Sequence, residues 1–378
     1  MGLSSAQPVH ARDRAGPPCR DDRRHAPPQP CRRLARTLAG LILPVVAALA
    51  GTAPGTRAEP LRIATFSPEL SRKGPGLLLR DILKREDPQI AAAVAAIAAV
   101  DPDILLLTGI DWDLEGRALD ALAGLLAEAG APYPHRFAPR PNTGLPSGAD
   151  LDGDGRPGRP RDAQGYGRFA GEGGMALLSR HPVIAGQARD FSALLWRDLP
   201  GAQLPEQAGA PFPSEAAQAV QRLSSTGHWA VPVAAPGGTV TLLAFAATPP
   251  VFDGPEDRNG LRNADEIRFW LRFLDGAFGA PPRARFVLLG NANLDPVDGE
   301  GLHGAIAALL ADPRLQDPAP ESAGGRAAAT PGHRGDPAQD TADWWEEDDG
   351  PGNLRVDYVL PSAEWRVPGA GVPCLPYR

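Results

Sequence analysis

Short apolar runs separated by polar turns divide the chain from residue 61 onward into predicted strands and helices. Leu61–Thr65 alternates apolar and polar residues and predicts a strand, whereas Ile104–Thr108 is a continuous apolar run after Asp101-Pro102. A continuous run of this length is typical of a central strand that is buried on both faces. The same reasoning predicts further strands at Met175–Ser179, Phe286–Leu289 and Val356–Leu360.

Apolar residues recur at helical spacing in three segments, each of which is predicted to pack one face against a core. These segments are Pro88–Val100, Leu119–Ala129 and Asp265–Leu274. The strand-like runs His228–Val233 and Val240–Ala246 are joined across Pro236-Gly237-Gly238, which favours an antiparallel pair. Strands mixed with helices and hairpin-like neighbours predict an α/β fold, in which two sheets pack face to face with helices outside.

Glycine and proline, 43 residues of each, gather in the connections between these elements. Gly144–Gly174, Leu199–Glu215 and Pro318–Gly352 have the composition of loops. The part of the chain after residue 58, about 320 residues, fits one large domain. Residues 59–378 are therefore expected to form a single domain.

Residues 1–58 have the features of an export signal. Arg32, Arg33 and Arg36 precede an apolar run from Leu38 to Ala50, and small residues flank Arg57. A membrane span needs about 20 apolar residues, so the run predicts a cleaved signal and no stable membrane anchor. An uncleaved anchor or a buried helix is the alternative. The expected location is the periplasm or the space outside the cell.

Charge and cysteine content narrow the classes of partner. Residues 1–58 hold nine arginines and three aspartates, so the rest of the chain has 29 basic and 42 acidic residues and a net charge of −13. An acidic surface repels polyanions unless a local patch or a metal ion offsets it, which argues against non-specific nucleic-acid binding. Cys19 and Cys31 lie in the N-terminal segment, so Cys374 is left alone and no internal disulfide is expected.

Five segments combine an apolar run with polar residues at its end. They are RIATFSPEL (Arg62–Leu70), PDILLLTGIDWD (Pro102–Asp113), TLLAFAATPP (Thr241–Pro250), VLLGNANLDP (Val287–Pro296) and LRVDYVLPS (Leu354–Ser362). Together they resemble the endonuclease/exonuclease/phosphatase superfamily, whose members resemble pancreatic-type deoxyribonuclease, abasic-site endonucleases and inositol-phosphate phosphatases. The resemblance covers most of residues 61 to 362. It implies a four-layered α/β sandwich and metal-dependent hydrolysis of a phosphomonoester or phosphodiester, with Mg²⁺ or Mn²⁺ as cofactor.

The first two motifs depart from the family pattern. The first usually ends in an asparagine that helps to fix the metal-binding carboxylate, and Ser67 stands there. The second usually carries the glutamate that is the main metal ligand, and the aligned residue is Gly109. Asp111 is predicted to point to the same face of the strand and to take over the cation. An ordinary loop aspartate is the alternative.

The later motifs lack groups that move protons. The resemblance implies a histidine at Ala246 and an aspartate at Asn291, and neither alanine nor an amide acts as an acid or a base. Asn293 keeps the position that contacts phosphate in the family, and Asp357 keeps the acid that orients a second histidine. Asn291, Asn293 and Asp357 are therefore expected to be what is left of a degenerate catalytic site.

No histidine follows in the tail Val372–Arg378, where the family has its second catalytic histidine. The domain is therefore expected to be truncated at its C-terminal end, by natural decay or by a frameshift. Five other histidines are interpreted as structural or solvent-facing residues: His135, His181, His228, His303 and His333.

An acidic segment resembles the first half of a calcium loop. Asp150, Asp152 and Asp154 alternate before Gly155, as in an EF-hand, but Arg161 occupies the twelfth position, where a glutamate belongs. A structural Ca²⁺ loop and a solvated acidic turn both fit this pattern.

The segment Val251–Asn259, together with Arg262-Asn263, resembles the exported bacterial branch of the superfamily. Guanidinium groups bind phosphate with two parallel hydrogen bonds, so Arg258 and Arg262 are predicted to contact a phosphate. Capping of an acidic loop is the alternative role for both.

These observations predict an exported phosphoesterase-family protein with a weak or inactive site, which makes it a candidate pseudoenzyme. Its expected ligand is a small phosphorylated substrate or a phosphodiester. The alternative is a non-catalytic relative that binds phosphate or calcium. A third interpretation is a decayed or misread gene without a selected function.

Overall fold

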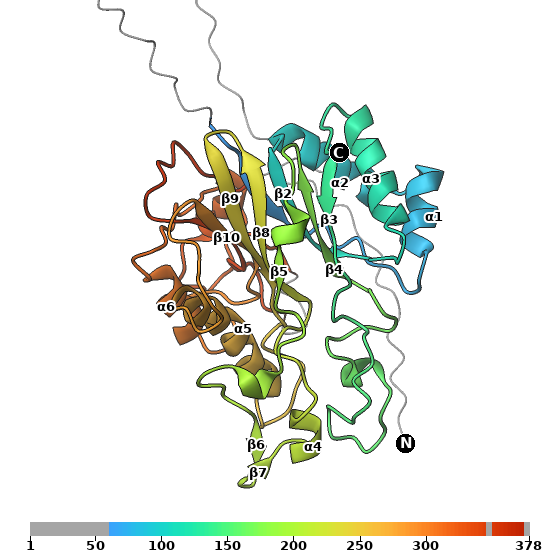
Figure 1. Ribbon diagram of the computed structural model, residues 1–378, viewed down its shortest axis with the longest axis vertical. Coiled ribbons are helices and arrows are strands. Elements are labelled where there is room, and N and C mark those ends of the chain that lie inside the picture. The colour runs from blue at the N-terminus through green and yellow to red at the C-terminus, as the bar shows by residue number, and fades with distance from the viewer. Residues whose placement is uncertain (1–59, 345–349, 374–378) are drawn as a thin grey trace, which may run out of the picture. The chain divides into compact units, whose positions relative to one another are not determined.

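Two β-sheets form the centre of the computed structural model (Figure 1), which describes residues 60–344 and 350–373. The first sheet has the order β1-β2-β4-β3, with β1 Ile63–Phe66, β2 Ile104–Ile110, β3 His135–Phe137 and β4 Gly174–Ser179. The second has the order β11-β10-β9-β8-β5, with β5 Arg189–Asp190, β8 Gly227–Ala235, β9 Gly238–Ala246, β10 Phe286–Asn291 and β11 Asp357–Pro361. A separate hairpin pairs β6 Glu206–Gln207 with β7 Ala210–Pro211.

Helices lie between and after the strands in chain order. They are α1 Leu77–Lys84, α2 Pro88–Val100, α3 Arg117–Glu128, α4 Glu215–Gln218, α5 Arg258–Leu274, α6 Gly304–Leu310 and α7 Ala323–Ala327. Local chemistry fixes the start of α2, because Pro88 is its first residue and the Asp87 side chain accepts hydrogen bonds from the backbone N–H groups of Gln89 and Ile90.

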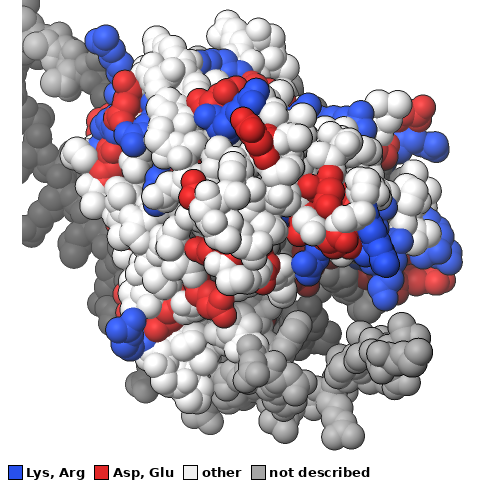
Figure 2. All heavy atoms as spheres, turned by 90° about the horizontal axis from the view of Figure 1, so that it is seen from below, with Lys and Arg blue, Asp and Glu red and all other residues white. Residues whose placement is uncertain are grey.

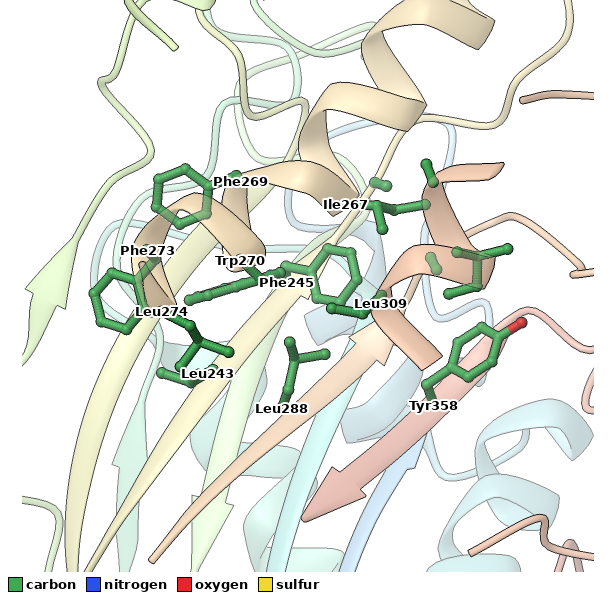
Figure 3. Packing of buried hydrophobic residues seen from close by; sticks show 14 of the residues in the cluster. Leu243, Phe245, Ile267, Phe269, Trp270, Phe273, Leu274, Leu288, Leu309 and Tyr358 are labelled. Atoms are coloured by element: carbon green, nitrogen blue, oxygen red, sulfur yellow. The ribbon is translucent and has the colours of Figure 1, made fainter. Parts of the chain in front are cut away.

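Three apolar cores hold the layers together. One lies between the two sheets, where Ile104 and Leu106 of β2 pack in the same cluster as Leu242 and Leu289 of the second sheet. The outer face of the first sheet packs against α1, α2 and α3. The outer face of the second sheet packs against α5 and α6, as Figure 3 shows for the aromatic and aliphatic residues of this cluster. The predicted α/β sandwich with helices outside both sheets is therefore confirmed.

Four of the strands that carry the sequence motifs end at the same edge of their sheets, and the fifth, β11, begins there. β1 runs parallel to β2, and β9 runs parallel to β10. In Figure 1 the turn between β8 and β9 lies at the top, and the long connections around residues 140–170 and 195–220 lie at the bottom, beyond the ends of the strands. Polar residues that follow these strands are thereby gathered at one edge.

Most predicted elements appear within two residues of their expected bounds, but α5 differs. It begins at Arg258, seven residues before the predicted start at Asp265. Its first two turns bury the polar side chains of Arg258, Arg262 and Asn263, so the apolar spacing that predicts a helix is absent there.

All described residues belong to one compact unit. Among the described helices, none has the length and apolar character needed to cross a membrane. The predicted export segment, residues 1–58, and Cys374 lie outside the described residues.

Candidate functional site

Three of the sequence-predicted positions lie side by side on neighbouring strands. Asn291 of β10 is the register partner of Ala246 in β9 and of Asp357 in β11. Ala246 and Asn291 are the last residues of their strands, and Asp357 is the first residue of β11. We call Ala246, Asn291 and Asp357 the strand-end row.

The strand-end row faces the space between the two sheets. Val287 and Leu289 precede Asn291 at alternate positions and pack in the core between the sheets. Side chains alternate across a strand, so Asn291 points to the same face. Gly290 lies between them with φ 143°, and a Cβ there would come 1.8 Å from the Phe245 carbonyl oxygen. Only glycine permits this approach of β10 to β9.

Two oxygens of the row have no hydrogen-bond partner among the described residues. These are Oδ1 of Asn291 and Oδ1 of Asp357, both of which are buried. Burial raises the pKa of the Asp357 carboxyl to about 7, and hydrogen bonds with the Asn291 and Thr341 side chains oppose the rise. Desolvation favours the neutral form of a carboxyl group, so Asp357 is a carboxyl that is protonated over much of the acidic pH range.

Hydrogen bonds from α5 and from the β10 loop fix the backbone beside the row. Asn263 Nδ2 donates to the carbonyl oxygens of Thr248 and Ala292, at 2.7 and 2.8 Å. Asn293 Nδ2 donates to the Ala247 carbonyl at 2.7 Å. This amide hydrogen is thereby used within the fold, and the predicted contact of Asn293 with phosphate stays a prediction.

Glu266 of α5 holds a second part of this framework. Its carboxylate accepts hydrogen bonds from the backbone N–H groups of Ser225 and Thr248, at 2.6 and 2.7 Å, and from the Ser225 hydroxyl at 2.7 Å. Burial raises the pKa of Glu266, which Arg262 and these hydrogen bonds oppose. Sequence reasoning missed Glu266, although a glutamate inside the apolar segment Asp265–Leu274 is a signal for a buried polar role.

His228 is structural, as the sequence interpretation held. Its Nε2 lies 3.0 Å from the Glu266 carbonyl oxygen and its Nδ1 lies 2.9 Å from Ser224 Oγ. A carbonyl can only accept, so Nε2 carries the proton and Nδ1 accepts from the hydroxyl. Burial lowers the pKa of His228 to about 4, which keeps the ring neutral at ordinary pH.

The guanidinium groups of Arg258 and Arg262 bind backbone carbonyls. Arg262 donates to Leu223, Gln164, Arg222 and Ser224, and Arg258 donates to Leu151. Burial lowers the pKa of both side chains, that of Arg262 to about 10. These hydrogen bonds join α5 to two long loops. The predicted contact of both arginines with phosphate stays a prediction.

The Asp111 side chain does not lie on the face of β2 that strict alternation of side chains predicts. The pairing of β2 with β4 shifts between Thr108 and Ile110, and Gly109 in this bulge has φ 66°. A bulge adds one residue and breaks the period of two. Asp111 instead accepts backbone hydrogen bonds from Gly173 and Arg72, at 3.0 and 2.9 Å, and burial raises its pKa.

Ser67 lies close to the bulge at Gly109. A Cβ at Gly109 would come 3.6 Å from Ser67 Oγ. The first two motifs therefore meet in space, although neither supplies a carboxylate at this point. Two open hollows of about 300 and 320 Å³ include Asp111 in their lining, and neither includes a residue of the strand-end row.

The carboxylates that lie close together in the acidic loop are not the predicted set. Asp150, Asp152 and Asp162 have carboxylate oxygens within 4.8 Å of one another. Asp154 instead pairs with Arg159 at 2.6 Å. Asp162 follows the twelfth position by one residue, and a short helical turn, Pro160–Asp162, brings it back to the loop. The expectation that Asp154 is the third carboxylate is therefore corrected.

Most oxygens of this acidic cluster already accept backbone hydrogen bonds. Asp150 accepts from Gly153 and Gly155, each at 2.8 Å. Asp162 accepts from Leu151 and Arg159, each at 2.8 Å. Carboxylates that hold turns in this way need no ion to be satisfied.

Acidic side chains gather near the middle of the face that lies at the bottom of Figure 1. Figure 2 shows this face, with the basic side chains mainly toward its margins. On this face the described residues form no continuous basic patch. Such a surface does not favour a polyanion.

The donors of the strand-end row do not fit the divalent cation that the family resemblance implies. Mg²⁺ takes oxygen ligands in a near-octahedral arrangement and is usually held by one or two carboxylates. Among the described residues the row offers one carboxyl, that of Asp357, whose pKa is raised to about 7. Gly109 offers no side chain, and both oxygens of Asp111 accept backbone hydrogen bonds. The row is therefore assigned no metal-dependent reaction step.

Solved structures with a similar chain path come from several bacteria. An endonuclease/exonuclease/phosphatase from Beutenbergia cavernae is 18% identical with a TM-score of 0.45, covering 79% of this chain and 63% of that one. This chain thus spans less than two thirds of that protein. Sphingomyelinase C from Streptomyces griseocarneus is 18% identical with a TM-score of 0.42, covering 82% of this chain and 86% of that one.

A Staphylococcus aureus beta toxin mutant with bound magnesium ions is 12% identical with a TM-score of 0.43, covering 80% of this chain and 84% of that one. No curated protein sequence matches the chain. The profile of the Endonuclease/Exonuclease/phosphatase family matches residues 78–376. That match covers most of the chain, and the chain belongs to this family.

Proposed function

We propose that this protein is a degenerate phosphoesterase, which keeps the framework of its family and hydrolyses phosphoesters weakly or not at all. One observation carries the proposal. Ala246, Asn291 and Asp357 are register partners on three adjacent strands, at positions where the family resemblance implies a histidine, an aspartate and an aspartate. Two of these three side chains are unable to transfer a proton.

The expected loss of activity is large. General acid–base help from one positioned side chain contributes about 10²–10⁴-fold. Asn291 replaces the implied base that prepares water for attack, and Ala246 replaces the implied histidine. Asp357 is the one residue of the row that titrates, and burial raises its pKa to about 7. A single carboxyl does not supply both a base for water and stabilisation of the charge that grows on phosphorus.

The surrounding framework supports descent from an active site. Asn263, Glu266 and Asn293 fix the ends of β9 and β10 through buried hydrogen bonds. Such a framework holds catalytic groups in place in an active enzyme. Its hydrogen bonds are all made in this chain, which supports substitution within a folded site over a decayed chain that no longer folds.

The proposed ligand is a small phosphorylated compound or a phosphodiester, met outside the cytoplasm. The ligand class follows from the family, and the location follows from the signal-like pattern of residues 1–58. The net charge of −13 after residue 58 and the acidic side chains in Figure 2 support a small ligand over nucleic acid.

Hydrolysis of bis(p-nitrophenyl) phosphate and p-nitrophenyl phosphate by the full chain tests the proposal. Mg²⁺, Mn²⁺ and Ca²⁺ would each be added, with EDTA as the control. The native chain is expected to be silent or at least about 10²-fold below the variant Ala246→His/Asn291→Asp. Chelator-sensitive turnover by the native chain at the level of that variant contradicts the proposal.

A matched control separates restored chemistry from added charge. Gln207 and Ala210 are exposed partners in the β6–β7 hairpin. The variant Ala210→His/Gln207→Asp therefore adds the same two side chains away from the row. Turnover in this control would show that the assay responds to surface histidine and carboxylate groups.

The second candidate is a binding protein without turnover. The observation in its favour is the retention of the framework around a row that lacks proton-transfer groups. Equilibrium dialysis with radiolabelled inorganic phosphate tests it on the native chain. Saturable binding together with silent hydrolysis favours the binding protein, and the absence of both favours a fold without a phosphate ligand.

A further inference from the structure

The two unpartnered oxygens of the strand-end row belong to directly paired residues. Asn291 and Asp357 are register partners in the antiparallel pairing of β10 with β11. Oδ1 of each side chain is buried and has no hydrogen-bond partner among the described residues. A buried acceptor without a partner is destabilising. Two such atoms on paired residues would both be satisfied by one hydrogen-bond donor between them.

A divalent cation is a poor occupant because of charge. The row holds one carboxyl, so a bound Mg²⁺ or Mn²⁺ leaves a net charge of at least +1 in a buried position. Burying one uncompensated charge is strongly destabilising. Gly109, at the position of the implied main ligand, has no side chain, and Asp111 holds the backbone N–H groups of Gly173 and Arg72 outside the row.

A proton satisfies the same atoms without leaving a charge. A protonated carboxyl donates one hydrogen bond, and the Asn291 oxygen is an acceptor on the paired residue. The resulting acid–amide pair is neutral, which suits a site between two packed sheets. The environment agrees, because burial raises the pKa of Asp357 and only hydrogen bonds with Asn291 and Thr341 oppose it.

We propose that Asn291 and Asp357 form a neutral acid–amide pair at the strand ends, and that this pair keeps the row from binding a divalent cation. This inference rests on the proposed function, since the amide at position 291 that removes the implied base also leaves the row with a single carboxyl. It adds a property that hydrolysis assays do not measure, namely the affinity of the row for a metal ion.

Binding of Mn²⁺ to the full chain, followed by electron paramagnetic resonance, tests the proposal. The acidic cluster of Asp150, Asp152 and Asp162 is a competing site, so all variants carry Asp152→Asn. In the Asp152→Asn chain, the further substitution Asp357→Asn is expected to leave Mn²⁺ binding unchanged. Adding Asn291→Asp is expected to tighten Mn²⁺ binding at least about tenfold, since affinity follows the number of charged ligands.

Gln207→Glu is the matched control, because it adds one carboxylate to the exposed β6–β7 hairpin. It is expected to leave Mn²⁺ affinity unchanged. Saturable Mn²⁺ binding in the Asp152→Asn chain that Asp357→Asn abolishes overturns the proposal. A folded Asn291→Asp variant that gains no affinity overturns it as well, because the amide would then not be the cause of the loss.

Infrared spectroscopy gives a second readout that does not depend on any variant with two adjacent carboxylates. The difference spectrum between the native chain and Asp357→Asn at pH 6 is expected to contain the C=O band of a protonated carboxyl. A carboxylate band in its place overturns the acid–amide pair. Failure of the two proposals is distinguishable: metal-free hydrolysis contradicts the degenerate site alone, whereas metal binding at a silent row contradicts the acid–amide pair alone.

Discussion

Asn263 donates a hydrogen bond to the Thr248 carbonyl oxygen, with 2.7 Å between the two atoms. The same nitrogen donates to Ala292, so one buried amide joins the segments that follow β9 and β10. Asn263→Ala leaves two buried carbonyls without this donor, at about 1 kcal/mol or more for each. The free energy of unfolding, measured in urea, is expected to fall by about 2–3 kcal/mol.

Asn259→Ala is the control for this change, because Asn259 makes one such bond, to Val251, from a half-buried position. Its cost is expected to stay near 1 kcal/mol, about the value of one hydrogen bond. Equal losses in the two variants would contradict the bridging role of Asn263.

Gly290→Ala is expected to be among the most damaging single changes in the chain. The new Cβ would come 1.8 Å from the Phe245 carbonyl oxygen, at a φ of 143°. The strands must separate to admit it, so a loss of about 3 kcal/mol or more, or failure to fold, is expected. Gly304→Ala is the matched control. A Cβ at Gly304 meets nothing within 4 Å, and stability there is expected to stay level or to rise by up to about 1 kcal/mol.

Asp357 is expected to make the folded protein less stable as pH rises. Burial raises its pKa from 3.8 to about 7, so between these values the folded state binds more protons than the unfolded state. The free energy of unfolding then falls as pH increases through this window. At about 1.4 kcal/mol per pH unit, the full shift corresponds to at most about 4 kcal/mol.

Urea unfolding of the native chain and of Asp357→Asn at pH 5 and pH 8 measures this effect. The amide does not titrate, so the variant is expected to lose less stability between the two pH values. Parallel losses in the two proteins would assign the pH dependence to other groups.

The acidic loop is expected to hold its shape without calcium. Asp162 accepts backbone hydrogen bonds from Leu151 and Arg159, and Asp162→Ala is expected to cost about 1–3 kcal/mol through these lost bonds. Asp154→Ala removes a partly exposed ion pair with Arg159 and is expected to cost less than about 1 kcal/mol. EDTA is expected to leave the midpoint of thermal unfolding unchanged, and a fall of several degrees would show that the loop depends on a bound ion.

The fold follows from the sequence because apolar runs report burial directly. Ile104–Thr108 and Phe286–Leu289 are strands in the structure, each extended by two residues at its C-terminal end. The start of α5 was not predicted, since Arg258, Arg262 and Asn263 are buried by hydrogen bonding to loops distant in the sequence. Prediction from hydrophobic spacing treats polar residues as exposed. It therefore fails where a helix buries polar side chains that hydrogen-bond to loops.

The site is predictable only as far as strand register can be foreseen. Ala246, Asn291 and Asp357 lie in one row because β9 and β10 end at the edge where the antiparallel β11 begins. The prediction for Asp111 relied on strict alternation, which the bulge at Gly109 interrupts. Asp162 was missed because its approach to Asp150 depends on a turn, Pro160–Asp162, that no residue pattern announces.

The aromatic cluster behind the second sheet, part of which Figure 3 shows, gives the protein an optical signal of its own. Trp196 and Trp270 of this cluster are fully buried, as is Trp229 in the core between the sheets. The tryptophan fluorescence should therefore be blue-shifted in the folded protein and should move to longer wavelength on unfolding. His228 is stacked on Trp270, with ring centroids 5.5 Å apart and planes 23° from parallel. Protonation of that imidazole near pH 4 would quench the indole, so the emission is expected to fall as the pH drops through this value.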